Sequence, residues 1–228
     1  MLRVKNLNKS FGKNLVLNDV NFEAQQGEIL VIKGESGAGK TTLIRCICNL
    51  EEPDSGQIEI DQVQMLEKTG KKRNADIYQD KVGLVFQGYN LFPHLNIMDN
   101  LTVAVLSQKL MSKEQAEEKA LQTLEKLGIR DKADQYPHQL SGGQKQRVAI
   151  GRSIMLNPSI LCFDEPTSAL DSKTTEGIAE IIRLLASDGI CILIITHDNE
   201  FADKIATRQL HMVKSKLYGN PEGIAIAK

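Results

Sequence analysis

The spacing of apolar and polar residues along the chain predicts its main secondary-structure elements. Continuous apolar runs of strand length indicate four buried strands, at 29–33, 82–86, 160–163 and 190–195. Segments with helical periodicity lie between some of these runs and predict helices at about 40–49 and 174–186. Buried strands that alternate with helices are typical of an α/β fold with a mainly parallel core sheet.

The first thirty residues show a different pattern. Short predicted strands are separated by polar turns at 9–14 and 25–27, an arrangement that is typical of antiparallel hairpins. Strict alternation of apolar and polar residues at 57–61 predicts a further, half-buried strand. We therefore expect an N-terminal antiparallel β subdomain beside the parallel core.

Residues 88–157 are mainly helical in pattern. Ser112 and Gln115 have the spacing of a capping box, and the amphipathic helix that follows is expected to stop at Gly128. Because buried strands resume after this stretch, we expect a helical subdomain inserted into the core. The predicted organisation is one domain, 1–228, with the core and antiparallel subdomain at about 1–87 and 158–228 and the helical subdomain at about 88–157.

Composition narrows the possible functions. The chain has 228 residues, and its 28 Lys and Arg against 29 Asp and Glu do not supply the basic surface that nucleic-acid binding requires. No apolar run approaches the roughly 20 residues that cross a bilayer, and the N-terminus lacks the apolar core of a secretory signal. The four cysteines form no C-x-x-C pair, which predicts buried thiols and a reducing, cytoplasmic location. The polar stretch 64–81 is expected to be a solvated surface loop.

The clearest chemical motif is a phosphate-binding loop. Residues 34–41, GESGAGKT, fit the pattern G-x-x-x-x-G-K-[ST] between a predicted strand and a predicted helix. Its glycines let backbone N–H groups point at a phosphate, and the helix start adds roughly half a positive charge. Lys40 is expected to reach the β- and γ-phosphates, and Thr41 to hold Mg²⁺ through its hydroxyl. The alternative is a glycine-rich turn without a ligand.

Two carboxylates follow the predicted strand 160–163. Asp164 and Glu165 lie at its carboxyl end, where parallel sheets bind their ligands, and Pro166 ends the strand. Asp164 is expected to complete the Mg²⁺ site, and Glu165 to act on the water that attacks the γ-phosphate. The alternative, a solvated acidic turn, is disfavoured by the phosphate-binding loop.

Residues 140–144, LSGGQ, begin a further helix that is expected to run to about 156. Ser141 and Gln144 form a second capping box. The cap does not explain Gly142 and Gly143, each of which costs about 1 kcal/mol relative to alanine in a helix. Glycine suits a helix start that must press its bare N–H groups against an anion, so we expect a second phosphate contact here.

Together these motifs resemble the nucleotide-binding subunits of ABC transporters, over residues 1 to about 208. Residues 140–144, with Gln146 and Arg147, match the signature of that family, which is the most specific motif of the chain. Phe11 lies where the family stacks an aromatic ring on adenine.

Three further matches extend the resemblance. Gln87 matches the Q-loop glutamine of the family, 168–171 its D-loop and His197 its switch histidine. The resemblance implies that His197 contacts the γ-phosphate and positions the attacking water. It also implies that Gln87 contacts Mg²⁺ and that water, and links them to the helical subdomain.

The resemblance implies a head-to-tail homodimer, with each ATP between the phosphate-binding loop of one copy and residues 141–144 of the other. It also implies integral-membrane permease subunits as partners, at the cytoplasmic face of the cell membrane, and no nucleic acid. The site residues so predicted are catalytic Lys40, Gln87, Glu165 and His197; nucleotide-binding Phe11, Gly34, Glu35, Ser36, Gly37, Ala38, Gly39, Lys40, Thr41, Thr42, Ser141, Gly142, Gly143 and Gln144; and metal-binding Thr41, Gln87 and Asp164.

Within the family, the stretches 85–94, 96–101 and 136–139 look most like importers of polar amino acids. That likeness adds an extracytoplasmic solute-binding protein as a candidate partner. Subunits of lipoprotein-release, cell-division and macrolide-efflux complexes have a similar sequence style and are the alternative. The C-terminal part departs from the pattern, because a glycine-centred turn and a Glu-rich end are expected after Arg208, and 217–223 is only loosely similar.

Two other classes of protein compete with a transporter subunit. A soluble ABC ATPase that acts as a mechanical switch on DNA or ribosomes usually carries coiled-coil insertions or tandem cassettes, and the sequence shows neither. A P-loop GTPase or small-molecule kinase would not explain residues 140–144, and no suitably placed N-K-x-D motif is present. The apolar loop 89–93 either packs on the subunit's own core or forms a groove for a short permease helix.

Overall fold

The computed structural model describes residues 1–64, 78, 80–168 and 170–219. Its central sheet has six strands in the order β10-β9-β3-β8-β7-β6. Neighbouring strands in this sheet pair in parallel, except β9 and β10, which pair antiparallel. The strands are β3 (Ile29–Lys33), β6 (Val82–Val85), β7 (Ile160–Asp164), β8 (Cys191–Ile195), β9 (Arg208–Val213) and β10 (Lys216–Tyr218). The mainly parallel core expected from the sequence is therefore confirmed.

The hydrophobic pattern predicts neither β9 nor β10. In β9 only Leu210 and Met212 are buried, so its apolar run is too short to stand out. The turn that joins the two strands places Lys214 and Ser215 at φ 45° and 69°, where a glycine-centred turn is expected. The Ser215 carbonyl accepts a hydrogen bond of 2.8 Å from the Asn18 backbone N–H, which ties this turn to the neighbouring sheet.

The second sheet is antiparallel, with the order β2-β1-β4-β5, as the first thirty residues predict. Its hairpin is longer than expected, because the β1–β2 pairing continues to Phe11 and Asn14 and the break predicted at 9–14 shrinks to a turn at 12–13. Asn6 and Asp19 adopt positive φ where the pairing shifts register. The strands are β1 (Leu2–Phe11), β2 (Asn14–Ala24), β4 (Ser55–Ile60) and β5 (Val63–Gln64).

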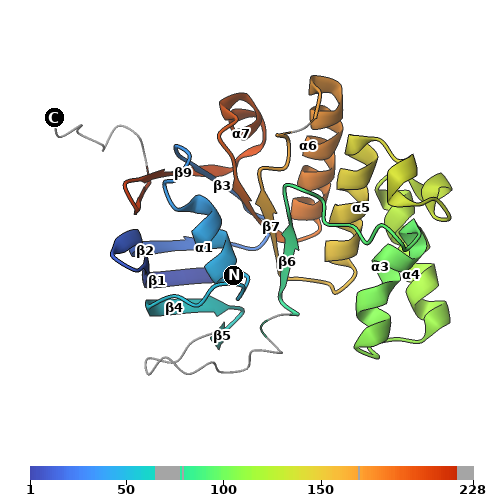
Figure 1. Ribbon diagram of the computed structural model, residues 1–228, viewed down its shortest axis with the longest axis horizontal. Helices are drawn as coiled ribbons and strands as arrows, with labels where there is room; N and C mark the ends of the chain where they lie inside the picture. Colours follow the sequence, from blue (N-terminus) through green and yellow to red (C-terminus); the bar gives the residue numbers. More distant parts are fainter. Residues whose placement is uncertain (65–77, 79, 169, 220–228) are drawn as a thin grey trace.

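Alternate residues of the parallel strands point to opposite faces and build two separate cores. On one face, Val31, Phe163 and Ile194 pack with the apolar sides of the helices that cover the sheet. On the other face, Ile32 and Cys162 pack with α1 and the antiparallel sheet. Figure 1 shows α1 (Lys40–Ile47) between the two sheets. The phosphate-binding loop lies at the N-terminal end of α1.

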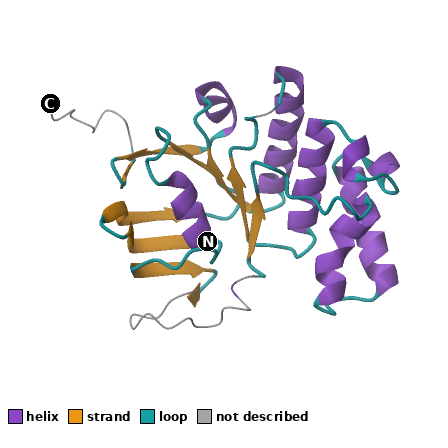
Figure 2. Ribbon diagram, in the orientation of Figure 1, coloured by secondary structure: helices purple, strands orange, loops and turns teal. Residues whose placement is uncertain are grey.

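Helices gather at the opposite side of the molecule from the antiparallel sheet, as the purple and orange ribbons of Figure 2 show. The capping boxes predicted for Ser112 and Ser141 are both present, and Gly128, at φ 68°, follows the end of α4. The helices are α3 (Ile97–Ser107), α4 (Lys113–Lys126), α5 (Gly142–Ile154), α6 (Ser172–Ser187) and α7 (Asn199–Ile205), with short 3-10 turns η1 (Arg130–Lys132) and η2 (Pro137–Gln139).

The cysteines are free, and Cys46, Cys162 and Cys191 are buried. Burial raises the pKa of the Cys46 and Cys191 thiols to about 12, so both stay protonated near neutral pH. Within the described part of the chain, no helix is both long enough and apolar enough to cross a membrane. Most of the predicted surface loop 64–81, Ala169 of the 168–171 match and the end of the 217–223 stretch lie outside the described residues.

Candidate nucleotide-binding site

A cavity of about 550 Å³ opens at the carboxyl ends of β3, β7 and β8. Because these strands are parallel, the loops that follow them meet at one edge of the sheet, where α/β folds bind their ligands. The cavity is lined by Val16, Ser36, Gly37, Gly39, Lys40, Thr41, Thr42, Gln87, Asp164, Glu165 and His197. Segments that are distant in sequence thus bring most of the predicted site residues together.

The phosphate-binding loop has the conformation that its glycines permit. Gly37 and Gly39 adopt φ 79° and 108°, which side chains disfavour. A Cβ atom on Gly39 would overlap the Val16 carbonyl oxygen, and one on Gly34 would overlap the Met212 carbonyl oxygen. The loop is therefore held between β2 and β9, with its helix N-terminus facing the cavity, the arrangement that suits an anion.

Lys40 places its cation at the base of this loop. Its Nζ donates to the carbonyl oxygens of Gly34 and Glu35 at 2.7 and 2.9 Å, and the residue is 7% exposed. Burial lowers the pKa of the ammonium, while the nearby Glu165 and Asp164 carboxylates oppose that shift. A buried lysine held by backbone carbonyls is well placed to exchange one of them for a phosphate oxygen.

Asp164 and Thr41 supply oxygen atoms beside the loop. Both residues line the cavity, and burial together with the adjacent Glu165 carboxylate raises the pKa of Asp164. Arg45, Thr41 and Lys40 oppose this shift. A carboxylate and a hydroxyl are hard oxygen donors of the kind that Mg²⁺ prefers, so this pair fits the metal expected from the sequence.

Glu165 is held in one orientation by the loop after β8. Its backbone has φ 51°, an uncommon conformation for a residue with a side chain. The Thr196 hydroxyl donates to Oε2 of Glu165 at 3.1 Å, and Nδ1 of His197 lies 2.9 Å from Oε1. The carboxylate is mostly buried, whereas the His197 ring is 70% exposed at the cavity mouth.

Two residues of the site were missed by sequence reasoning. Thr196 is fully buried and its hydroxyl also accepts from the Asp198 backbone N–H at 3.0 Å. Its position directly before His197, at the end of a buried strand, is the signal that could have found it. Val16 lines the cavity from β2 and touches the phosphate-binding loop, and nothing in its local sequence marks it.

Gln87 is linked to Glu165 through a serine. Gln87 Nε2 donates to the Ser168 hydroxyl at 3.2 Å, and that hydroxyl donates to the Glu165 carbonyl oxygen at 3.2 Å. Ser168 begins the stretch matched to the D-loop, and Asp171 at its end caps α6 by accepting from the Thr174 backbone N–H. The stretch therefore connects the cavity with the N-terminus of α6.

Phe11 does not line the cavity. It lies at the tip of the β1–β2 hairpin with 47% of its surface exposed, and the Lys9 ammonium is 4.9 Å from the centre of its ring. The hairpin residue that does line the cavity is Val16. Adenine stacking by Phe11 therefore stays a prediction.

Residues 141–144, here called the signature turn, are also absent from the cavity lining. Ser141 and Gln144 cap each other, with the Ser141 N–H donating to Gln144 Oε1 at 2.9 Å. Gly143 is buried, and a Cβ atom there would overlap the methyl group of Thr174 in α6. Close packing against α6 therefore requires glycine at position 143. From the sequence, this glycine is explained only by contact with an anion.

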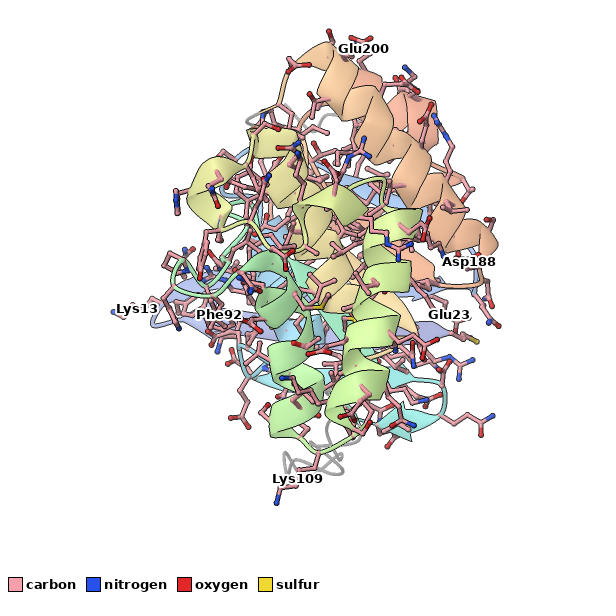
Figure 3. All side chains as sticks on the ribbon, turned by 90° about the vertical axis from the view of Figure 1, so that its right-hand side faces the viewer. Lys13, Glu23, Phe92, Lys109, Asp188 and Glu200 are labelled. Atoms are coloured by element: carbon pink, nitrogen blue, oxygen red, sulfur yellow. The ribbon has the colours of Figure 1, made fainter. Side chains whose placement is uncertain are left out.

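In the apolar loop after Gln87, some residues pack on the subunit's own core and one remains exposed, where it could contact a permease helix. Tyr89 and Leu91 pack against the subunit's own core, whereas Phe92 is 42% exposed. Arg152 fixes the loop by donating to the Asn90 carbonyl at 2.6 Å, and its guanidinium lies 5.5 Å from the centre of the Phe92 ring. Figure 3 shows Phe92 at the edge of the helical end of the molecule.

Comparisons with known proteins agree with this geometry. The ABC transporter family model matches residues 17–168. The glutamate/glutamine/aspartate/asparagine transport ATP-binding protein BztD of Rhodobacter capsulatus is 43% identical over 95% of this chain and 81% of its own length. The general L-amino acid transport ATP-binding protein AapP of Rhizobium johnstonii is 42% identical over 98% and 86%.

A solved structure extends the similarity to the fold. The dimeric, post-hydrolysis ATP-binding cassette MJ0796 bound to ADP and Pi superposes with a TM-score of 0.82, at 34% identity, over 95% of this chain and 96% of that one. The phosphate-binding loop, the paired carboxylates and the overall similarity lead to one assignment. The chain belongs to the ABC transporter family, among its ATP-binding subunits.

Proposed function

We propose that the chain binds ATP and Mg²⁺ and hydrolyses the ATP to drive a membrane transporter for polar amino acids. The observation that carries this proposal is the composition of the cavity wall. Lys40, Asp164, Glu165 and His197 converge on it, whereas the signature turn does not contribute to it. A site that holds the catalytic groups but lacks a predicted phosphate contact is suited to completion by a second copy.

Nucleotide binding is assigned to the phosphate-binding loop and the start of α1. The backbone N–H groups of 36–41 and the Lys40 ammonium would hold the phosphates. Val16 and Phe11 are the candidates for contact with the adenine ring. Thr41, Asp164 and Gln87 would hold Mg²⁺, which neutralises phosphate charge when it is bound.

Glu165 is assigned as the general base. It would take a proton from a water molecule whose oxygen attacks the γ-phosphorus, while the bond from that phosphorus to the β–γ bridging oxygen breaks and ADP leaves. Thr196 and His197 hold the carboxylate by hydrogen bonds, so its orientation is fixed before the nucleotide arrives. The exposed face of His197 is available to the γ-phosphate.

A second copy would supply the remaining contact. In a two-fold, head-to-tail dimer, the signature turn of each subunit faces the nucleotide of the other, and its helix N-terminus adds partial positive charge. The solved relative MJ0796 is dimeric in its ADP and Pi state, which supports this arrangement. We propose that the whole chain works as one domain, with 88–157 as the helical subdomain that carries the turn.

The proposals for the membrane partner and for the cargo rest on the relatives of the chain. BztD and AapP are named as ATP-binding proteins of amino acid transport, which supports permease subunits as partners at the cytoplasmic face of the membrane. An extracytoplasmic solute-binding protein would complete such an importer. Exposed Phe92, next to the loop that carries Gln87, is the proposed contact for the permease.

The shared-site mechanism is tested by the dependence of ATPase rate on protein concentration. Because two copies form each site, the rate should rise faster than linearly at low concentration. Glu165→Gln should bind ATP, turn over at a small fraction of the normal rate and elute as a dimer on size exclusion in MgATP. A first-order rate in a chain that stays monomeric with ATP would exclude the shared site.

The cargo is tested with the assembled transporter. The subunit is co-purified with its permease in lipid vesicles, and ATP hydrolysis is measured with each of a panel of amino acids and the matching solute-binding protein. Stimulation by a polar amino acid, and not by an apolar one, is the expected result. Equal rates with every solute would contradict the proposed import of polar amino acids.

A further inference from the structure

Three helices meet at the guanidinium group of Arg147, which lies on α5 one turn beyond the signature turn. Its Nη1 donates to the Leu127 carbonyl oxygen, at the end of α4, at 2.7 Å. A Cβ atom on Gly177 of α6 would lie 2.7 Å from Nη2, and one on Gly128 would lie 3.1 Å from Nη1. The guanidinium therefore occupies space that two glycines leave open.

A second close contact lies one turn earlier on the same helix. Gly143 of the signature turn packs directly against the side chain of Thr174 in α6. The backbone N–H and the hydroxyl of Thr174 both donate to the Asp171 carboxylate, at 2.9 and 3.0 Å. Thr174 therefore links the signature turn to Asp171, the residue that ends the 168–171 stretch.

The end of α4 explains why a cation belongs at position 147. The last carbonyl groups of a helix lack partners within it and carry the negative end of its dipole, so a positive side chain there is favoured. Arginine adds a planar fork whose two Nη atoms can reach a carbonyl on one helix and the backbone of another. The guanidinium approaches Gly177 through Nη2, because a Cβ atom there would lie 2.7 Å from Nη2 but 3.9 Å from Cζ.

We infer that Arg147 is a positioning residue, which holds the signature turn against the 168–171 stretch so that both face a partner subunit as one unit. The inference deepens the proposed function, because it rests on the signature turn completing the site of a second copy. Arg147 is not in the cavity wall, so its effect on hydrolysis must pass through the turn.

The first test uses the monomer without nucleotide and does not depend on dimerisation. Hydrogen exchange is measured by mass spectrometry in wild type and in Arg147→Gln. Exchange in 142–145 and 172–175 should become about tenfold faster, because a hydrogen bond from a charged donor is lost. Exchange in α1 should not change. If the signature turn of Arg147→Gln exchanges at the same rate as in wild type, the inference is overturned.

Two further variants control this test. Arg183→Gln removes the same charge from α6 and also breaks an arginine-to-carbonyl hydrogen bond, to Lys204 at 3.2 Å, so it should leave exchange in 142–145 at the wild-type level. Gly177→Ala keeps the arginine but places a methyl group 2.7 Å from Nη2, close enough to displace the guanidinium, so it should reproduce the effect of Arg147→Gln. If Arg147→Gln fails to fold, Gly177→Ala decides the question.

The second test separates positioning from simple stabilisation. ADP affinity of the monomer, melting temperature and the protein concentration at half-maximal ATPase are measured for each variant. Positioning predicts unchanged ADP affinity and a half-maximal concentration about tenfold higher in Arg147→Gln. A lower melting temperature with an unchanged half-maximal concentration would overturn it. A first-order rate in wild type would instead refute the shared site of the proposed function, and the exchange data would still decide what Arg147 holds.

Discussion

One buried hydroxyl group helps to orient the proposed general base, Glu165. The Thr196 hydroxyl is the buried donor to Glu165, and it is linked in turn to the Asp198 backbone. The carboxylate also contacts the exposed His197 ring, but that contact lies at the cavity mouth, where water competes. Thr196 therefore supplies the better protected of the two side-chain contacts.

Thr196→Val should lower kcat about tenfold or more while leaving KM for ATP nearly unchanged, because a buried hydrogen bond to a charged group is lost. Steady-state ATPase kinetics measure both constants. Thr102→Val is the matched control, since its hydroxyl is also buried but donates to the Met98 carbonyl in α3. Equal loss of kcat in the two variants would contradict a specific role for Thr196.

The raised pKa of Asp164 predicts a pH dependence of metal binding. Burial and Glu165 favour the protonated carboxyl, so as pH falls this group takes up its proton earlier than an ordinary aspartate. A metal ligand must be deprotonated, so the gain in ATP affinity that Mg²⁺ gives should fade at a correspondingly higher pH.

Calorimetric titration of the wild-type chain with a non-hydrolysable ATP analogue, with and without Mg²⁺ from pH 4 to 8, measures this dependence and keeps the Glu165 carboxylate in place. Asp164→Asn removes the titrating group, so its Mg²⁺ effect should be small and flat with pH. A Mg²⁺ effect in the Asp164-containing protein that is constant over this range would contradict the assignment of Asp164 as ligand.

At the scale of elements, two helices begin with the same capping motif, but only one of the two motifs lies in the signature turn. Ser112 and Ser141 each form a capping box, at the starts of α4 and α5. Removing either hydroxyl leaves a helix N–H without its partner, which costs about 1 kcal/mol. Only the second lies in the signature turn.

Ser112→Ala and Ser141→Ala should therefore lower the melting temperature by a similar amount, about 2–4 °C. ATPase at fixed protein concentration should fall in Ser141→Ala alone, beyond the loss of Ser112→Ala. Thermal melts and rate measurements on the two variants make the comparison. Equal ATPase rates in Ser112→Ala and Ser141→Ala would contradict a role of the signature turn in hydrolysis.

Locally encoded elements could be predicted from the sequence, and elements that depend on distant partners could not. The two capping boxes and the phosphate-binding loop consist of neighbouring residues, so their spacing identifies them. Strand β9 depends on pairing with β3, and the turn at Lys214 is held by contacts to β2. The same reason explains Val16, which reaches the cavity only because the hairpin folds over the loop.

For the whole molecule, the proposed contacts lie on different surfaces and can be perturbed separately. The cavity opens at the strand ends, while Phe92 is exposed at the edge of the helical side (Figure 3). Gln87 connects the two, because it lines the cavity and precedes the loop that carries Phe92. Coupling to a permease can therefore fail while the nucleotide site stays intact.

Phe92→Asp should leave ATPase of the isolated subunit close to wild type and abolish most solute-stimulated transport in vesicles, because a charge replaces an apolar contact. Leu110→Asp is the control, since Leu110 is also exposed, at the far end of α3 from Phe92. Transport that is normal in Phe92→Asp would place the permease contact elsewhere. Loss in both variants would indicate general damage.

The glycine next to the Arg147 guanidinium has a consequence for natural variation in the family. A Cβ atom at position 177 would lie 2.7 Å from Nη2, so a side chain there would displace the guanidinium, whereas Gly128, at φ 68°, disfavours a side chain whatever lies beside it. Relatives that carry a larger residue at position 177 should lack arginine at 147. An alignment of many relatives should therefore show positions 147 and 177 varying together.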